Sequence, residues 1–228
     1  MATATLDRPA KTIAPAGSAS SAKSLIKSLI HAVATVAVSP LLLSFYLTAK
    51  MIGPDRALES ASQTLAILPG LTGVFLRRAF LARVLAKCHP TAEVSFGTLL
   101  SQCGAEIGEN VYVGPRCHLG LVRLEPNVLV AAGVHIPSGG KTHHFADPAV
   151  PIKDQGGERC RVTIGEGAWI GSAAVVLADV GRGTIVAAGA VVTKPLPEFV
   201  IAAGVPARIV RPRFDHGMGP TLDEGASA

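Results

Sequence analysis

Residues 107–120 read IGENVYVGPRCHLG and residues 164–171 read IGEGAWIG, so that in both stretches an aliphatic residue followed by glycine returns every six positions. A helix repeats its faces every 3.6 residues, so a helical pattern would drift out of phase with a period of six within two repeats. The period instead predicts short strands stacked coil on coil, with one hexad on each face of a triangular prism. Continued through residues 94–194 with small slips, it predicts a mainly β fold, a parallel β-helix of about five coils.

Two kinds of irregularity interrupt the period. Small slips fall between Leu119 and Leu124 and between Val176 and Val186, and we expect them at corners of the prism. The long interruption is residues 139–161, a polar segment inside an otherwise repetitive chain. An ordered insertion of this kind is usually functional. We therefore expect the active-site loop there, and its candidate side chains are His143, His144, Asp147, Asp154 and Gln155.

The composition fits a narrow core and excludes some functions. Hydrophobic residues make up 49% of the chain but aromatic residues only 4%, so small aliphatic side chains must fill the interior. The 21 basic residues exceed the 16 acidic ones, but they are scattered, which does not indicate nucleic-acid binding. The cysteines lack CxxC spacing, which predicts reduced thiols rather than disulfides or structural zinc. They are Cys88, Cys103, Cys117 and Cys160.

The chain before the repeat has a different character. Residues 1–22 are rich in Ala, Ser, Thr and Pro, and we expect a disordered tail there. Residues 29–49 contain no Lys, Arg, Asp or Glu, over a length close to the roughly 20 residues that cross a bilayer. Residues 23–88 are therefore predicted to form a helical, membrane-associating region. A helix buried at a subunit contact is the alternative.

The sequence leaves the form of membrane attachment open. Basic residues after the apolar segment outnumber those before it, which places the C-terminal domain on the cytoplasmic face of the membrane. Pro40 permits a re-entrant hairpin as well as a kinked span. Residues 57–87 continue in a helical pattern that breaks at Pro69-Gly70, and we expect an amphipathic collar at the membrane surface. The basic residues counted are Lys50, Arg56, Arg77, Arg78, Arg83 and Lys87 after the segment, and Arg8, Lys11, Lys23 and Lys27 before it.

Three stretches together resemble a known family. They are the hexads, the loop segment HHFADP at residues 143–148, and the segment AAGVPARIVR at residues 202–211. The domain expected over residues 89–213 is similar to the hexapeptide-repeat acyltransferases, in particular the branch that O-acetylates sugars and polysaccharide precursors. The resemblance implies left-handed coiling, acetyl-CoA as the donor, and a homotrimer that binds the cofactor between adjacent chains. Residues 214–228 are expected to form a flexible tail.

The chemistry gives the loop a role. Moving an acetyl group from a thioester to a hydroxyl requires a base, and imidazole titrates close to working pH. Loops of this family branch read His-x-Phe-x-Asp-Pro, which implies His143 as the base and leaves His144 as the alternative. Asp147 is a candidate to hold the ring in the correct tautomer. Direct transfer in a ternary complex is expected, because no nucleophile motif such as Gly-x-Ser-x-Gly is present.

The resemblance also implies a donor site. The phosphates of coenzyme A require fixed cations, and the pantetheine arm requires small neighbours. The candidates for the phosphates are Lys194, Arg208 and Arg211. Those for the pantetheine channel are Ser172, Ala188 and Thr193, and Ser172 is also a candidate oxyanion donor. Trp169 is expected to point outward, either against a neighbouring chain or into the acceptor site.

The sequence is also compatible with two other functions. A metal-dependent hydrolase or lyase on the same β-helix would need three convergent histidines, and His118, His135 and His143 are available. A non-catalytic membrane-bound scaffold is a third possibility. Cys117 is interpreted as a small residue of the coil rather than a nucleophile. For a membrane-attached enzyme of this family, a lipid-linked or cell-envelope glycan is the expected acceptor.

Overall fold

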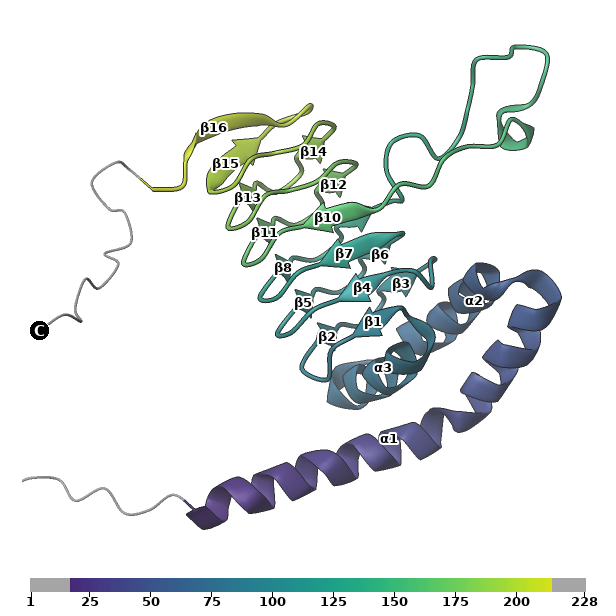
Figure 1. Ribbon diagram of the computed structural model, residues 1–228, viewed down its shortest axis with the longest axis vertical. Helices are drawn as coiled ribbons and strands as arrows, with labels where there is room; N and C mark the ends of the chain where they lie inside the picture. The colour runs from purple at the N-terminus through teal and green to yellow at the C-terminus, as the bar shows by residue number, and fades with distance from the viewer. Residues whose placement is uncertain (1–16, 215–228) are drawn as a thin grey trace, which may run out of the picture.

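The structure is a computed structural model that describes residues 17–214, with side chains from Leu29 onward (Figure 1). Three helices precede a prism of short strands. The helices are α1 (Gly17–Ile52), α2 (Pro54–Ala66) and α3 (Gly70–Val84). The expected tails at residues 1–16 and 215–228 lie outside the described residues. Residues 17–22, expected to belong to the N-terminal tail, are instead the first turns of α1, because Ala and Ser in this stretch are compatible with a helix that continues from the apolar segment.

Three sheets form the faces of the prism, and within them every strand pair is parallel except the last, β15 with β16. Sheet A holds β1 (Lys87–Cys88), β4 (Glu106–Ile107), β7 (Val122–Leu124) and β10 (Val162–Ile164). Sheet B holds β2 (Glu93–Val94), β5 (Tyr112–Val113), β8 (Leu129–Val130), β11 (Trp169–Ile170), β13 (Ile185–Val186), β15 (Val200–Ala203) and β16 (Arg208–Pro212). Sheet C holds β3 (Leu99–Leu100), β6 (His118–Leu119), β9 (His135–Ile136), β12 (Val175–Val176) and β14 (Val191–Val192). The prediction of a parallel β-helix preceded by a helical region is confirmed.

The repeating aliphatic residue is the inward side chain of each strand. Ile107, Val113 and Leu119 are all fully buried, as are their counterparts in later coils. The glycine that follows the aliphatic residue is required for a different reason. A Cβ built on Gly171 would lie 2.5 Å from the backbone nitrogen of Ala188 in the next coil, so the close stacking of coils requires glycine at this corner.

One edge of the prism takes all the irregularity. At the A-to-B and B-to-C corners, the buried residue of one strand is followed six positions later by the buried residue of the next strand. At the passage from sheet C back to sheet A, here called the C-to-A edge, this spacing varies. The steps there run from Leu100 to Ile107, from Leu119 to Leu124, from Ile136 to Ile164, and from Val176 to Val180. Both slips therefore lie at a corner, as expected, and residues 139–161 leave the prism at the same edge. Figure 1 shows this loop, which contains the short helix η1 (Ile152–Asp154), projecting away from the strands.

Helices α2 and α3 cover the N-terminal end of the prism, where the first coil would otherwise expose its core (Figure 1). Their junction is held by Arg77, which is only 2% exposed. Its Nε donates to the Val94 carbonyl at 2.8 Å, and its Nη1 donates to the carbonyls of Leu65 at 3.0 Å and Leu68 at 2.7 Å. Arg77, one of the basic residues counted after the apolar segment, is therefore buried and does not lie at a membrane surface, since the guanidinium instead caps the last turn of α2.

Helix α1 continues through Pro40 without reversing direction. Residues Leu29–Ile52 of this helix are long and apolar enough to cross a membrane by length and composition, with a mean hydropathy of 1.8. Only 17% of the most apolar stretch is buried against the rest of the protein. The expected helix break at Pro69-Gly70 is present, because α2 ends at Ala66 and α3 starts at Gly70.

Candidate functional site

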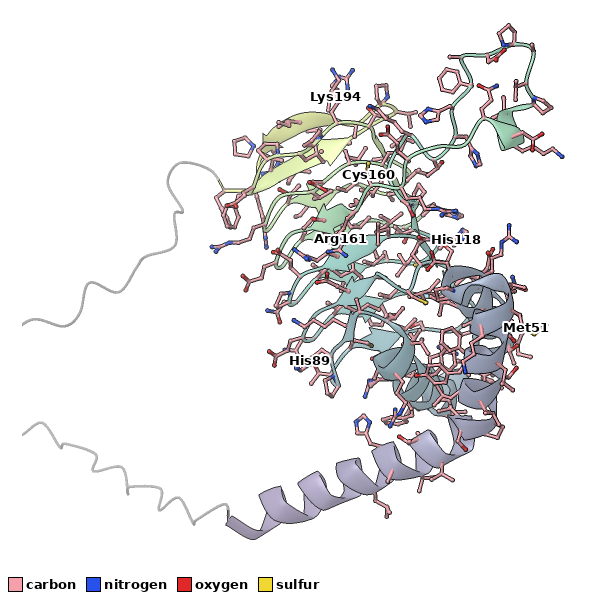
Figure 2. The ribbon with its side chains drawn as sticks, turned by 45° about the vertical axis from the view of Figure 1, so that its right-hand side comes forward. Met51, His89, His118, Cys160, Arg161 and Lys194 are labelled. Carbon is pink, nitrogen blue, oxygen red and sulfur yellow. The ribbon has the colours of Figure 1, made fainter. Side chains whose placement is uncertain are left out.

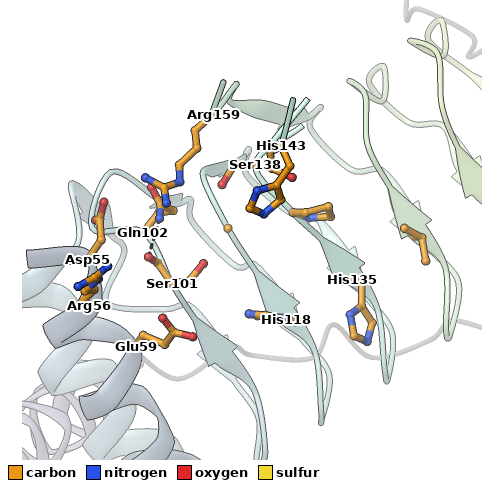
Figure 3. Close-up of a pocket in the computed structure, with 14 residues that line it drawn as sticks. Asp55, Arg56, Glu59, Ser101, Gln102, His118, His135, Ser138, His143 and Arg159 are labelled. Carbon is orange, nitrogen blue, oxygen red and sulfur yellow. Dashed lines mark hydrogen bonds between the residues drawn. The ribbon is translucent and has the colours of Figure 1, made fainter. Parts of the chain in front are cut away.

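A groove of ≈ 570 Å³ lies between α2, the outer face of sheet C and the base of the 139–161 loop (Figure 3). Three histidines line it, His118 and His135 from the sheet and His143 from the loop. Helix α2 contributes Asp55, Arg56 and Glu59 at the opposite side, and Arg159 reaches in from the returning limb of the loop. The groove therefore combines imidazoles with charged groups of both signs.

His118 and His135 occupy the same position in successive coils. They are register partners on β6 and β9, and their ring centroids lie 6.0 Å apart in an edge-to-face arrangement. Their side chains face outward because the alternate residues, Leu119 and Ile136, fill the core. The sheet thus supplies a fixed pair of imidazoles on the floor of the groove.

His143 is held by the base of the loop, where the two limbs pair with each other. The Cys160 amide donates to the Ser138 carbonyl at 2.9 Å, and the Glu158 amide donates to the Lys141 carbonyl at 2.8 Å. A Cβ on Gly157 would overlap the Thr142 carbonyl, so the limbs approach each other as closely as glycine allows. This pairing fixes the backbone on either side of His143.

The structure places the other four candidates of the loop, His144, Asp147, Asp154 and Gln155, outside the groove. His144 is exposed, and its amide donates to the Gly156 carbonyl at 3.0 Å. Asp147 lies toward the tip, where its Oδ1 accepts from the Ala149 amide at 2.8 Å and its own amide donates to Gln155 Oε1 at 3.1 Å. Within residues 29–214 it makes no hydrogen bond to a histidine. The expected orienting role of Asp147 is therefore not seen in one chain, because the loop extends outward and carries the carboxylate away from His143.

The candidate donor residues lie on other parts of the prism. Ser172 and Ala188 stack at the corner between sheets B and C in successive coils, where the Gly189 amide donates to the Ser172 carbonyl at 2.8 Å. Thr193 and Lys194 follow β14, and Arg208 and Arg211 lie on β16, the last strand of sheet B. Figure 2 shows Lys194 at the end of the prism away from the helices. All six side chains are exposed. None of the six lines the groove that contains His143.

Trp169 points outward, as expected, and is 47% exposed. It stands on sheet B in register with Leu129 on one side and Ile185 on the other, and Tyr112 continues the row. The residue therefore belongs to an apolar row on a different face from the histidine groove.

The structure gives less support to a metal site or a thiol nucleophile than to a histidine base. In the described part of the chain, no three His, Cys, Asp or Glu side chains are placed to hold one metal ion, although three histidines share the groove. Cys117 is buried, burial raises the pKa of its thiol, and its Sγ donates to the Ala131 carbonyl at 3.1 Å. It is a residue of the coil, as interpreted from the sequence.

Sequence reasoning missed part of the groove. The α2 side chains Asp55, Arg56 and Glu59 carry no motif, and only the packing of α2 beside β3 brings them to the site. The pair His118 and His135 did carry a signal, because each directly precedes the aliphatic residue that closes the third hexad of its coil. Two outward residues at equivalent positions in adjacent coils must lie side by side.

Comparisons with known proteins agree on the kind of protein. A family profile described as "Hexapeptide repeat of succinyl-transferase" matches residues 104–137 and 161–194. Galactoside O-acetyltransferase of Escherichia coli K12 is 30% identical over 151 residues, which cover 54% of this chain and 71% of that protein. Serine acetyltransferase of Salmonella typhimurium is 31% identical over 154 residues, 66% of this chain but only 46% of that protein. A solved structure of a galactoside acetyltransferase in complex with coenzyme A superposes with a TM-score of 0.57 at 26% identity, covering 72% of this chain and 85% of that one.

Proposed function

The chain belongs to the hexapeptide-repeat acyltransferase family, and from this we propose that it is an acetyl-CoA-dependent O-acetyltransferase acting on a hydroxyl of a sugar or envelope-polysaccharide precursor. The observation that carries the proposal is the position of His143 in a groove with room for an acceptor. The similarity to a galactoside O-acetyltransferase supports a sugar acceptor.

His143 is the proposed general base. It takes the proton of the acceptor hydroxyl as the oxygen attacks the thioester carbon, and the proton then passes to the departing coenzyme A sulfur. The outward rings of His118 and His135 would hydrogen-bond the acceptor and hold its hydroxyl toward His143. No group of the protein needs to carry the acetyl group in this scheme.

The donor site is proposed to lie between chains of a homotrimer. The candidate donor residues are exposed and lie outside the groove of their own chain, as expected if they face the His143 of a neighbour. Lys194, Arg208 and Arg211 would then meet the phosphates of coenzyme A, while Ser172, Ala188 and Thr193 would border the pantetheine arm. A site of this kind is complete only in the oligomer.

One observation favours a second acceptor class. The groove offers Glu59 of α2, which would bind an ammonium group, and Arg56 of α2 with Arg159 of the loop, which would bind a carboxylate. This arrangement suits the amino acid serine, and a serine acetyltransferase is among the relatives. A neutral sugar uses neither charge, so the two acceptor classes are separable by assay.

We propose that the enzyme acts at the cytoplasmic face of a membrane, attached through α1. The support is the apolar stretch 29–49, most of which the rest of the protein leaves uncovered. A membrane-attached acetyltransferase would meet lipid-linked glycan precursors at the surface where they are built.

The first test measures thiol release from acetyl-CoA with the purified protein. The acceptors are a panel of neutral sugars, lipid-linked glycan precursors and serine. We expect turnover with a glycan acceptor, and His143→Ala should lower kcat by about 10²- to 10⁴-fold while the affinity for coenzyme A is kept, because only proton transfer is lost.

The matched control is His144→Ala, which removes the adjacent exposed imidazole. We expect it to retain close to full activity. Full activity in His143→Ala with an inactive His144→Ala would move the base by one residue, and turnover of serine alone would replace the sugar acceptor.

A further inference from the structure

Helix α1 presents apolar side chains on two opposite faces. On one face Ala34, Val38, Leu42 and Phe45 are buried, and the Phe45 ring meets Phe80 of α3 edge-on at 5.8 Å. The opposite face, here called the exposed stripe, repeats at spacings of three, four and seven residues, which place its members on one side of the helix. The exposed stripe consists of Leu29, Val33, Val36, Leu43, Leu47 and Met51, and its side chains are between 57% and 84% exposed.

The buried face fixes α1 lengthwise against charged parts of the protein. The Tyr46 hydroxyl donates to the Arg83 carbonyl at 3.2 Å, and Arg83 Nη2 donates to Thr35 Oγ1 at 2.8 Å. Helix α3, which carries Arg78 and Arg83, is itself packed on the first coil. A spanning helix needs about 20 residues within hydrocarbon, and α1 in this packing would draw both arginines in with it. Its geometry suits a helix that lies in the membrane plane.

A cleft of ≈ 330 Å³ opens between α1 and α3 beside these contacts. Arg78 and Arg83 line its α3 side, and His31 and Thr35 line its α1 side. Arg78 Nε is held by the Ala92 carbonyl at 2.6 Å, which leaves its terminal nitrogens to the cleft. Among the described side chains neither arginine makes an ion pair, since the ion pairs found there join Glu106 to Arg123 and Arg161. Glu93 lies close enough to Arg78 to interact with it electrostatically but forms no ion pair with it, and two fixed cations that are not ion-paired suit a phosphate.

The cleft lies at the height that a phospholipid headgroup would occupy. At about 100° per residue, positions 32 and 35 fall on the flank of α1 between the buried face and the exposed stripe, and position 31 falls at the edge of the buried face. An in-plane helix buries its apolar face about 5–10 Å into the boundary between headgroups and acyl chains. With the exposed stripe at that depth, the flank and its arginines stand among the headgroups.

The neutral flanks of the exposed stripe favour lipid over a second copy of the chain. Helices that pair in water usually place charged residues beside their apolar seam. Residues 29–49 contain no Lys, Arg, Asp or Glu, and the side chains beside the stripe include Ala37, Ser39 and Ser44. Such flanks cost little in a bilayer and give an aqueous helix pair no charge complementarity.

We propose that α1 lies in the plane of an anionic bilayer, with the exposed stripe in the acyl boundary and the α1–α3 cleft holding the phosphate of an anionic phospholipid through Arg78 and Arg83. The inference rests on the membrane attachment proposed above and differs from both the spanning and the re-entrant arrangements. The arrangement also predicts from which side an acceptor reaches the histidine groove. Helix α2 begins directly after the stripe ends, and its first turns line the histidine groove, so a lipid-linked acceptor would approach that groove from the membrane side.

The first experiment measures flotation of the full chain with vesicles of phosphatidylcholine alone or mixed with phosphatidylglycerol. We expect binding to both, and tighter binding to the anionic vesicles. Leu43→Asp, a change on the exposed stripe, should weaken binding to both by at least tenfold. The matched control is Ile152→Asp, which alters an equally exposed aliphatic residue on the 139–161 loop and should bind as the wild type does. Equal flotation of the two variants would overturn the role of the stripe.

The second experiment tests the cleft. The double variant Arg78→Gln/Arg83→Gln should lose most of the preference for anionic vesicles, about fivefold for each arginine. Lys153→Gln, which removes an exposed charge on the loop, should keep that preference. An unchanged preference in the double variant overturns the headgroup site. Stabilisation of the wild type by soluble glycerol 3-phosphate, without any vesicle preference, would assign the cleft to a free phosphate and overturn the lipid assignment.

The third experiment measures depth. The variant Leu43→Trp/Trp169→Phe has one tryptophan, on the exposed stripe. Its fluorescence is measured with vesicles of lipids brominated either close to the headgroup or at the end of the acyl chain, and the degree of quenching reports the depth of the stripe. Shallow bromines should quench more strongly. Stronger quenching by the deep bromines would leave membrane attachment in place and overturn the in-plane arrangement. Cross-linking of α1 between copies, with no vesicle binding, would replace the bilayer with a second chain.

Discussion

At the residue scale, the groove gives His135 a testable role that the loop motif did not suggest. Its ring stands on the floor of the groove, one coil from His118 and on the same face as the loop that carries His143. Loss of a hydrogen bond to the acceptor costs about 1–1.5 kcal/mol, or roughly tenfold. We expect His135→Ala to raise KM for the acceptor by that factor and leave KM for acetyl-CoA unchanged.

Initial-rate measurements with each substrate varied in turn would check this. A rise in KM for acetyl-CoA alone would place His135 at the donor instead of the acceptor. The matched control is His89→Ala, because His89 lies outside the groove and its ring bonds Thr91 Oγ1 at 2.8 Å.

The cysteines make a second prediction at this scale. Burial raises the pKa of Cys88 to about 11 and that of Cys103 to about 11, and it also raises the pKa of Cys117. Because the thiolate is the reactive form, only about one in a thousand of the Cys88 and Cys103 thiols is ionised at pH 8. Cys160 is exposed. Iodoacetamide should therefore label Cys160 first at pH 8, and labelling of Cys88 and Cys103 should rise as the pH approaches 11.

Mass spectrometry of the native protein after timed labelling gives the order. Rapid modification of Cys117 at pH 8 would contradict its assignment to the coil and reopen the question of a thiol nucleophile.

The residues also show where sequence reasoning stops. His143 could be proposed as the base, with His144 as the alternative, because the family loop pattern coincides with a break in the period. Asp147 is only four positions further on, but the loop projects from the prism and Gln155 Nε2 holds the Asp147 carbonyl at 2.7 Å near its tip. Asp147 is therefore close to His143 in the sequence but not in space, because each successive residue of an extended loop lies further from the prism.

At the scale of elements, the strands were predictable and the joints between them and the helices were not. Six-residue spacing determines which side chains enter the prism, so Ile107, Val113 and Leu119 could be assigned to the core from the sequence. No pattern marks Arg77 as buried. An arginine in a helix usually faces solvent, and here only the meeting of α2, α3 and the first coil supplies the three carbonyls that it binds.

Arg77 therefore makes a prediction about stability. Arg77→Met fills similar space but removes the donor to the carbonyls of Val94 and Leu68, whereas the Leu65 carbonyl keeps the backbone amide of Leu68 at 3.3 Å. Each buried acceptor without a partner costs about 1–3 kcal/mol, and some of this is recovered by relaxation, so we expect a loss of about 2–4 kcal/mol in the free energy of unfolding. Urea unfolding in detergent, with Lys153→Met as the surface control, measures it. Equal midpoints for the two variants would show that the buried guanidinium does not stabilise the junction.

At the scale of the whole molecule, the described chain holds the proposed base in a groove that none of the proposed donor residues lines. If each site forms between subunits of a homotrimer, two inactive variants can repair each other. His143→Ala lacks the base and Lys194→Ala lacks a donor cation. Co-expressed in equal amounts, they should regain about a quarter of the wild-type sites, because a quarter of the interfaces receive both intact contributions.

The measurement is the activity of the mixed preparation relative to each variant alone. Activity no higher than the average of the two separate variants would place the base and the donor residues in the same subunit. Sedimentation of the wild type as a monomer would have the same meaning. The control pairs His143→Ala with His143→Ala/Lys194→Ala, a mixture that contains no intact base and should remain inactive.

The concentration of every irregular step at the C-to-A edge has a consequence for how such a molecule can be altered. Two edges are bound by close backbone stacking, as at Gly171, and an added residue there would push apart neighbouring turns of the coil. The third edge already accepts steps from four residues to twenty-eight without disturbing the strands on either side. A protein engineer could therefore graft peptides of arbitrary length at Val176–Val180, one coil beyond the native loop, and obtain a second arm parallel to the first while the prism keeps its register.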